Sequence, residues 1–236
     1  MIGRIQSFQS MGAVDGPGIR CVVFLQGCPL RCVYCHNPET WDRMGGKEED
    51  TEKIVKKILQ YQTFIRKGGG VTISGGEPLL QPEFCRELFR RLKEEGIHTA
   101  LDTSGIGDLK KAKLVLEYTD LVICDVKFLS EKNYQIYCGG SLEQVKKFLE
   151  LVKEREIPMW LRHVVVPGIT DGEEEIVVLR ELGKQYPSVE KIELLPFKKI
   201  CLSKYENMQI EFPLKDIPAC TNEKIEQLKN IYKCFK

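Results

Sequence analysis

The sequence predicts an α/β fold in which a parallel sheet is rolled into a partial, laterally open (β/α)6 barrel. Strand-like and helix-like segments alternate through six units, which is typical of a parallel sheet with right-handed crossovers. A closed barrel of this kind needs eight units and about 250 residues. The chain has 236 residues and spends part of them on a long loop and a tail. We therefore expect six units that do not close into a ring.

Hydrophobic periodicity and turn residues define the predicted elements. Residues 1–19 form an extended lead-in with a turn at DGPG, and residues 20–26 are apolar and β-branched, as in a buried strand. Further strands are predicted at 71–74, 97–103, 120–126, 158–166 and 189–196. Helices are predicted at 51–66 with Thr51 as N-cap, 82–95, 110–118, 142–154, 173–186 and 222–233. We predict one domain, in which the six units occupy residues 20–200 and a tail with a closing helix occupies residues 201–236.

Composition excludes several classes of function. The 35 basic and 34 acidic residues nearly balance, so the sequence predicts no binding to nucleic acid or to a membrane surface. No apolar run approaches the roughly 20 residues that span a bilayer. Ten cysteines without a secretory segment indicate a reducing, cytoplasmic setting, and we expect a monomer.

The most informative stretch is GCPLRCVYCHNPETW, residues 27–41, which carries Cys28, Cys32 and Cys35. Soft thiolates select zinc, copper(I) or iron–sulfur clusters. Structural zinc sites and the four-iron clusters of electron carriers normally have four protein ligands. Three closely spaced cysteines therefore predict a [4Fe–4S] cluster with one iron left open for another ligand.

Three alternatives compete with the cluster. A disulfide with one spare thiol is disfavoured because no secretory segment precedes the cysteines. A zinc site with His36 as fourth ligand would require adjacent residues, Cys35 and His36, to occupy two tetrahedral corners. Three unrelated core cysteines would not explain the flanking loop residues Gly27, Pro29, Tyr34 and Pro38.

The C-x3-C-x2-C loop, with an aromatic residue before its last cysteine, resembles the radical S-adenosylmethionine (SAM) enzymes. The segments IGRIQSFQSMGAVDGPGIR, GGGVTISGGEPLLQPEF and VEKIELLPF narrow the resemblance to the activating enzymes of glycyl radical enzymes. The resemblance implies a radical-SAM barrel whose cofactors are the [4Fe–4S] cluster and SAM. In that family the amino and carboxylate groups of SAM chelate the open iron.

Polar residues end the predicted strands, where sites on parallel α/β folds gather. Gly75, Gly76 and Glu77 follow the second strand, where a plain turn is the alternative. A carboxylate at a strand end is usually a helix cap or a surface charge. Asp102 and Asp125, however, end neighbouring strands beside Lys127 at the mouth of an apolar barrel, where buried charges need partners. On the fifth strand, alternation lets only one of Arg162 and His163 point inward. The family pattern favours Arg162, and His163 is then structural.

The resemblance assigns these residues to ligands. It implies that SAM is bound by Tyr34, Cys35, His36, Gly75, Gly76, Glu77, Asp102, Asp125, Val126, Lys127 and Arg162. Lys198 is a further candidate, at a position where the family often has histidine. The resemblance also implies that Asp102, Thr103 and Asp125 hold a monovalent cation beside the SAM carboxylate, which Lys127 neutralises. Asp15, before the first strand, is implied to contact the protein substrate.

The reaction implied by the resemblance is reductive cleavage of SAM, followed by abstraction of a glycine Cα hydrogen by the 5′-deoxyadenosyl radical. The expected substrate is a glycyl radical enzyme, with pyruvate formate-lyase preferred, and flavodoxin or ferredoxin is the expected electron donor. Alternatives are activation of anaerobic ribonucleotide reductase, or a non-catalytic zinc or iron–sulfur carrier. The other seven cysteines are widely spaced and are interpreted as buried hydrophobes. A second cluster from Cys201, Cys220 and Cys234 is a weaker alternative, because residues 42–70 lack the cysteine-rich insert of activating enzymes with extra clusters.

Overall fold

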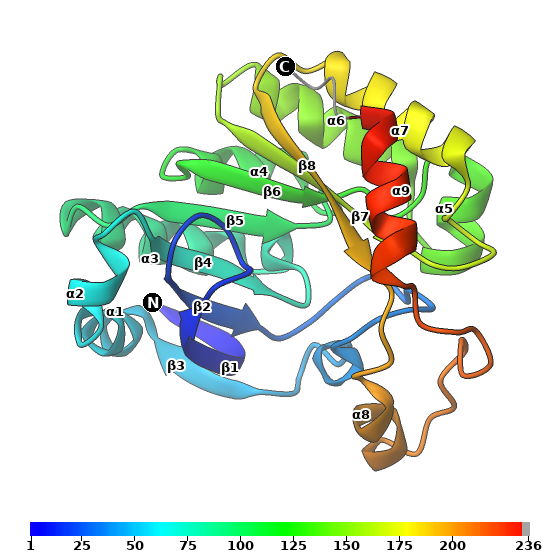
Figure 1. Ribbon diagram of the computed structural model, residues 1–236. Coiled ribbons are helices and arrows are strands. Elements are labelled where there is room, and N and C mark those ends of the chain that lie inside the picture. Colours follow the sequence, from blue (N-terminus) through cyan, green and yellow to red (C-terminus); the bar gives the residue numbers. More distant parts are fainter. Residues whose placement is uncertain (233–236) are drawn as a thin grey trace.

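One sheet organises the computed structural model, which describes residues 1–232 (Figure 1). Its strand order is β3-β1-β2-β4-β5-β6-β7-β8. The strands are β1 (Ile2–Gly12), β2 (Arg20–Leu25), β3 (Lys47–Asp50), β4 (Gly70–Gly75), β5 (Thr99–Thr103), β6 (Leu121–Asp125), β7 (Met159–Val165) and β8 (Val189–Pro196). From β2 to β8 all neighbours run parallel, whereas β1 pairs antiparallel with both β2 and β3. Because β3 and β8 lie at opposite ends of this order, the sheet stays open, and the predicted partial barrel is confirmed.

Helices follow the parallel strands, and all but the short helix at residues 202–207, which lies apart from the sheet, cover the outer face of the curved sheet (Figure 1). They are α1 (Thr51–Leu59), α2 (Gln62–Ile65), α3 (Pro82–Glu94), α4 (Leu109–Leu116), α5 (Glu131–Cys138), α6 (Leu142–Lys153), α7 (Glu173–Lys184), α8 (Leu202–Asn207) and α9 (Asn222–Tyr232). Two short 3-10 turns, η1 (Pro38–Thr40) and η2 (Pro78–Leu80), follow β2 and β4. Among the helices described here, none is long and apolar enough to cross a membrane.

The core divides between the two faces of the sheet. A large cluster, which includes Ile73, Leu101 and Leu149, fills the space between the sheet and the helices. Ala100 and Ile123 alternate with members of that cluster along their strands and therefore point to the inner face. There they form a small apolar cluster with Leu121, against which Trp160 packs. Asp102, Asp125 and Arg162 each follow two positions later on the same strands, so they share this inner face.

Local structure differs from the prediction at two places. The extended lead-in is largely a regular strand, β1, which buries Gly3 and Ile5 and pairs with β2. The helix predicted over residues 51–66 is interrupted between α1 and α2, and its N-cap is Asp50, whose carboxylate accepts from the Glu52 N–H at 2.8 Å. Thr51 is instead the first helical residue.

The sequence analysis also missed β3, α5 and α8. The signals for α5 were present in the chain. The Ser130 hydroxyl caps its first turn by accepting from the Asn133 N–H, and Gly139 ends it with a left-handed φ of 67°. These caps matter because the end of α5 supports the cysteine loop.

Candidate functional site

A pocket of about 340 Å³ opens at the carboxyl ends of the parallel strands, within the usual range for small-molecule sites. The predicted site residues that line it are Asp15, Cys28, Cys32, Tyr34, Cys35, His36, Gly75, Gly76, Asp102, Thr103, Asp125, Lys127 and Arg162. Another hollow, of about 240 Å³, lies between α4 and α6 and contains none of them. The structure therefore gathers predicted residues from six segments of the chain at one place.

The cysteine loop is held in place by α5. The backbone N–H groups of Arg31 and Val33 donate to the carbonyls of Cys138 and Tyr137, at 2.8 and 2.9 Å. Both acceptors lie in the last turn of α5, where helical carbonyls have no partner within the helix. The middle of the loop thus completes the end of this helix.

Two tyrosines fasten the other end of the loop. The Tyr34 hydroxyl donates to the Lys127 carbonyl at 3.1 Å, just beyond β6. The Tyr205 hydroxyl, from α8, donates to the Cys35 carbonyl at 3.2 Å. Trp41 packs edge-on against the Tyr205 ring, with ring centroids 6.0 Å apart. The chain beyond β8 therefore covers the loop from outside.

The three thiols suit a group that carries positive charge. Burial raises the pKa of Cys28 to about 12 and that of Cys35 to about 11. The neighbouring Cys138 thiol and burial together raise the pKa of Cys32. At neutral pH these thiols ionise only when a metal supplies compensating charge.

The arrangement fits a cluster better than one metal ion. Within residues 1–232, no three His, Cys, Asp or Glu side chains converge as ligands of a single ion. The cysteines of a [4Fe–4S] cluster bind different irons and need not converge on one atom. A ring nitrogen of His36, Nε2, contacts the Lys198 carbonyl at 2.8 Å, so Nδ1 is the ring nitrogen of His36 that this contact leaves open.

Gly75 and Gly76 bring the end of β4 against the start of the cysteine loop. A Cβ on Gly75 would lie 2.3 Å from the Leu25 nitrogen, and one on Gly76 would lie 2.1 Å from the Gly27 oxygen. The Gly76 and Glu77 N–H groups donate to the carbonyls of Leu25 and Gly27, at 2.9 and 2.8 Å. Only glycine allows this approach, so the turn and the loop form one backbone unit.

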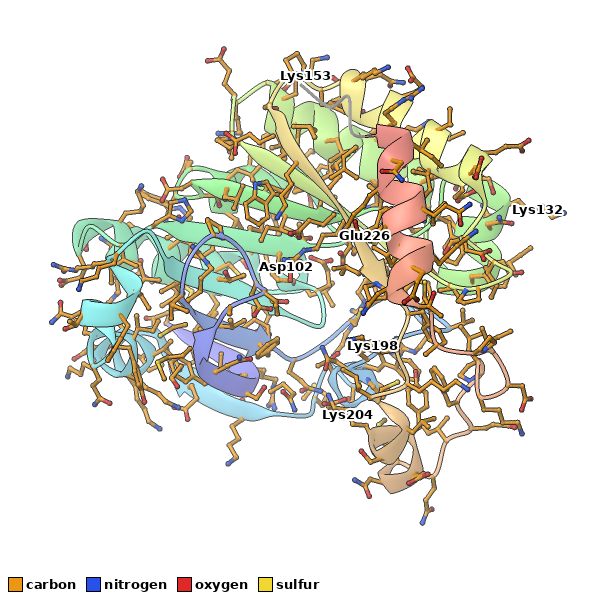
Figure 2. The ribbon with its side chains drawn as sticks, viewed as in Figure 1. Asp102, Lys132, Lys153, Lys198, Lys204 and Glu226 are labelled. Carbon is orange, nitrogen blue, oxygen red and sulfur yellow. The ribbon has the colours of Figure 1, made fainter. Side chains whose placement is uncertain are left out.

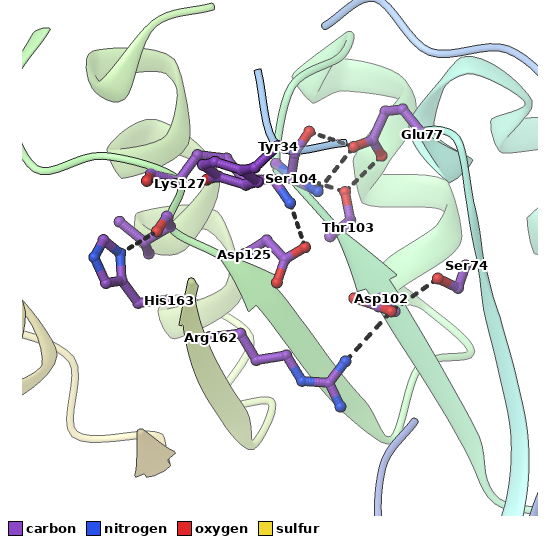
Figure 3. Close-up of polar contacts among 12 residues, drawn as sticks. Tyr34, Ser74, Glu77, Asp102, Thr103, Ser104, Asp125, Lys127, Arg162 and His163 are labelled. Atoms are coloured by element: carbon purple, nitrogen blue, oxygen red, sulfur yellow. Dashed lines mark hydrogen bonds and ion pairs between the residues drawn. The ribbon is translucent and has the colours of Figure 1, made fainter. Parts of the chain in front are cut away.

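The Glu77 carboxylate faces the protein interior and not the pocket (Figure 3). It accepts hydrogen bonds from the Thr103 hydroxyl at 2.5 Å, from the Ser104 N–H and hydroxyl at 2.8 and 2.5 Å, and from the Leu79 N–H at 2.9 Å. Burial raises the pKa of Glu77, while these bonds oppose the rise. Its side chain therefore joins the glycine turn to the end of β5.

Four charged side chains form the floor of the pocket (Figure 3). Lys127 Nζ lies 2.5 Å from Asp125 Oδ2, and Arg162 Nη1 lies 3.5 Å from Asp102 Oδ2, which also accepts from the Ser74 hydroxyl at 2.8 Å. Burial raises the pKa of Asp102 to about 6, and Arg162 opposes this rise. Burial lowers the pKa of Lys127. The negative charge of Asp125, acting together with Cys32 and Tyr34, more than offsets burial, so the pKa of Lys127 is raised.

Three predicted residues do not line the pocket, and Glu77 is one of them. Val126 is fully buried, and its carbonyl contacts Nδ1 of His163 at 2.8 Å, so both side chains lie away from the pocket. Lys198 is exposed on the segment between β8 and α8 (Figure 2), where its carbonyl contacts His36. A direct contact of these side chains with a ligand in the pocket is therefore not supported.

Sequence reasoning missed several residues of the pocket wall: Val14, Phe24, Leu30, Asn37, Thr40, Ser74, Ser104, Val164 and Leu195. Position along the chain could have identified some of them. Ser74 and Ser104 adjoin predicted residues, and Val164 lies two positions from Arg162 on the same face of β7. No local pattern marks Leu195 or Val14 as neighbours.

Comparison with known proteins identifies the family. The radical SAM superfamily pattern matches residues 22–179. The pyruvate formate-lyase-activating enzyme of Clostridium pasteurianum is 46% identical over 99% of this chain and 98% of its own, and pyruvate formate-lyase 1-activating enzyme of Escherichia coli K12 is 43% identical over 98% and 95%. A solved domain of pyruvate-formate lyase-activating enzyme from Bacteroides vulgatus is 27% identical, with a TM-score of 0.58, and covers 71% of this chain and 94% of that one.

We predict that Glu77→Gln lowers the free energy of unfolding by about 2–3 kcal/mol, because an amide presents an N–H₂ group to buried donors. Glu174→Gln, at an exposed position of α7, is the control and should leave stability within about 0.5 kcal/mol. Chemical denaturation monitored by circular dichroism measures both. Equal stability of the two variants would show that the four hydrogen bonds do not hold the turn.

Proposed function

This chain belongs to the radical SAM superfamily and, within it, to the pyruvate formate-lyase-activating enzymes, and on that premise we propose how its residues activate a glycyl radical enzyme. The proposed substrate is pyruvate formate-lyase. The observation that carries the proposal is that three cysteine thiols, a glycine turn and two carboxylate–cation pairs line one pocket. Because the members of this family are enzymes, the alternative of a non-catalytic metal carrier is excluded.

Cys28, Cys32 and Cys35 hold the [4Fe–4S] cluster in this proposal. When bound, the cluster and SAM together supply one electron and a carbon radical that removes a Cα hydrogen atom from glycine. The protein's own part is to bind, to orient and to exclude water. Apolar side chains of Leu30, Val164 and Leu195 on the pocket wall suit the last of these tasks.

The two cations provide the charge that a SAM carboxylate needs. Lys127 pairs with Asp125, and Arg162 pairs with Asp102 and with Glu193 of β8, yet both cations still reach the pocket surface. The backbone of Gly75 and Gly76, which also lines the pocket, receives the amino end of SAM. We assign to Lys127 the neutralisation of the carboxylate.

Asp102, Thr103 and Asp125 are the proposed ligands of a monovalent cation. The two carboxylates lie at the ends of adjacent strands, and the charge of Asp125 contributes to the raised pKa of Asp102. A cation between them would relieve this repulsion.

The remaining assignments concern the protein's surroundings. We propose that the chain acts as a single domain and a monomer in the cytoplasm, where its free thiols fit a reducing compartment. Flavodoxin or ferredoxin is the proposed electron donor. Asp15, on the pocket wall before β2, is the proposed contact with the substrate's glycine-bearing segment.

The first test separates the cluster cysteines from the others. Cys28→Ala, Cys32→Ala or Cys35→Ala should each abolish activation of pyruvate formate-lyase and cleavage of SAM, because the cluster loses a ligand. Cys201→Ala and Cys220→Ala are the controls, since both thiols are buried and neither lines the pocket. Cys234, which lies outside the described residues, is tested in the same way. Chromatography of 5′-deoxyadenosine and an assay of the activated lyase measure the outcome. Full activity without Cys28 would contradict the cluster assignment.

A second test concerns Lys127. Lys127→Met should weaken SAM binding by about tenfold or more, because a charge-assisted contact in a buried pocket is lost. Lys132→Met, exposed on α5, is the control and should bind SAM normally. Anaerobic calorimetry of cluster-loaded protein measures the affinity. An unchanged dissociation constant for Lys127→Met would refute its role at the carboxylate.

A further inference from the structure

The guanidinium of Arg162 joins three segments of the chain. Its Nε donates to Glu193 Oε2 at 2.8 Å, and its Nη2 donates to the Val14 carbonyl at 2.6 Å. Its Nη1 lies 3.5 Å from Asp102 Oδ2, and the side chain is only 7% exposed. Because the guanidinium is a rigid plane, a partner that fixes the Nε edge also directs the two terminal nitrogens.

Glu193 is the partner that fixes this edge. It lies on β8 directly across from Arg162 in the parallel register between β7 and β8. Its other carboxylate oxygen, Oε1, pairs with Lys191, whose ammonium lies 4.2 Å from the centre of the Trp160 ring. The carboxylate is therefore held from both sides, and Glu193 does not itself line the pocket.

The Val14 carbonyl belongs to an irregular loop, residues 13–19, that forms part of the pocket wall. Three side chains fasten this loop by its carbonyls. Arg162 binds that of Val14, the Thr72 hydroxyl donates to that of Asp15 at 2.6 Å, and Arg20 Nη1 donates to that of Pro17 at 3.1 Å. The Val14 side chain is 79% exposed, so the loop presents an apolar group to the outside of the pocket.

We infer that Glu193 is a positioning residue, which holds Arg162 in the orientation that fastens the 13–19 loop and so sets how tightly the enzyme binds its protein substrate. The inference rests on the proposed function, in which Asp15 of this loop contacts the substrate. It assigns to the β7–β8 strand pair a role in substrate affinity.

The charges around Arg162 explain why Glu193 is needed. Asp102 and Asp125 both attract the guanidinium toward the pocket floor. Without Glu193, nothing on β8 opposes that attraction, and Arg162 turns toward the floor and releases the Val14 carbonyl. The loop then keeps its attachments to Thr72 and Arg20 but loses its hydrogen bond to Arg162.

Three variants of the cluster-loaded enzyme test this inference. Glu193→Ala should speed amide hydrogen exchange in residues 13–19 and raise the KM for inactive pyruvate formate-lyase by about five- to tenfold, with kcat within about twofold. Glu193→Gln keeps an oxygen acceptor for Arg162 Nε and should restore both properties. Glu190→Ala is the matched control, because Glu190 is exposed on the same strand.

Unchanged exchange in residues 13–19 of Glu193→Ala would overturn the inference, as would a fall in kcat without a change in KM. The inference would also be overturned if Glu193→Gln did not restore slow amide exchange in residues 13–19. The exchange measurement needs no substrate. If the wild-type enzyme activated no lyase, the proposed function would be wrong, and exchange would still decide whether Glu193 positions the loop.

Discussion

The placement of the three thiols depends on hydrogen bonds that reach the cysteine loop from outside it. The loop has almost no regular structure of its own, so its geometry is set where the Glu77 N–H binds its first residue, Gly27, and where the end of α5 binds its middle. Glu77 then connects the glycine turn to β5 through Thr103 and Ser104. The cysteine loop and the strand ends are therefore one hydrogen-bonded unit, which a parallel sheet allows because its carboxyl ends meet at one edge.

Charge balance on the pocket floor is the second constraint. Asp102 and Asp125 are partly or deeply buried, and each has a cationic partner that also faces the pocket. Buried charges of this kind are tolerated only with partners, and a bound ligand competes for them. Arg162 extends the same network to the 13–19 loop and to Glu193. The ligand site and the outer wall of the pocket thus share one side chain.

Sequence reasoning identified the parts of the site that are local in the chain. The cysteine spacing, the glycine pair and the polar strand ends each occupy a few consecutive residues, and their chemistry limits the alternatives. The contact between Arg162 and Glu193 spans 31 residues and depends on the register of β7 and β8, which no local pattern specifies. The support from Tyr205 and α5 was missed for the same reason. The strand β1 was missed because its large apolar residues, Ile2, Ile5, Phe8 and Met11, recur at every third position and not at every second, as strand alternation requires.

The most direct test of the account follows one hydrogen atom. Inactive pyruvate formate-lyase, labelled with deuterium at glycine Cα, is mixed anaerobically with the reduced enzyme and SAM. The account predicts a SAM-dependent glycyl radical in the electron paramagnetic resonance spectrum of the lyase, and deuterium in the 5′-deoxyadenosine that is released. Cleavage of SAM with no glycyl radical and no deuterium transfer would contradict the claim that this pocket activates pyruvate formate-lyase.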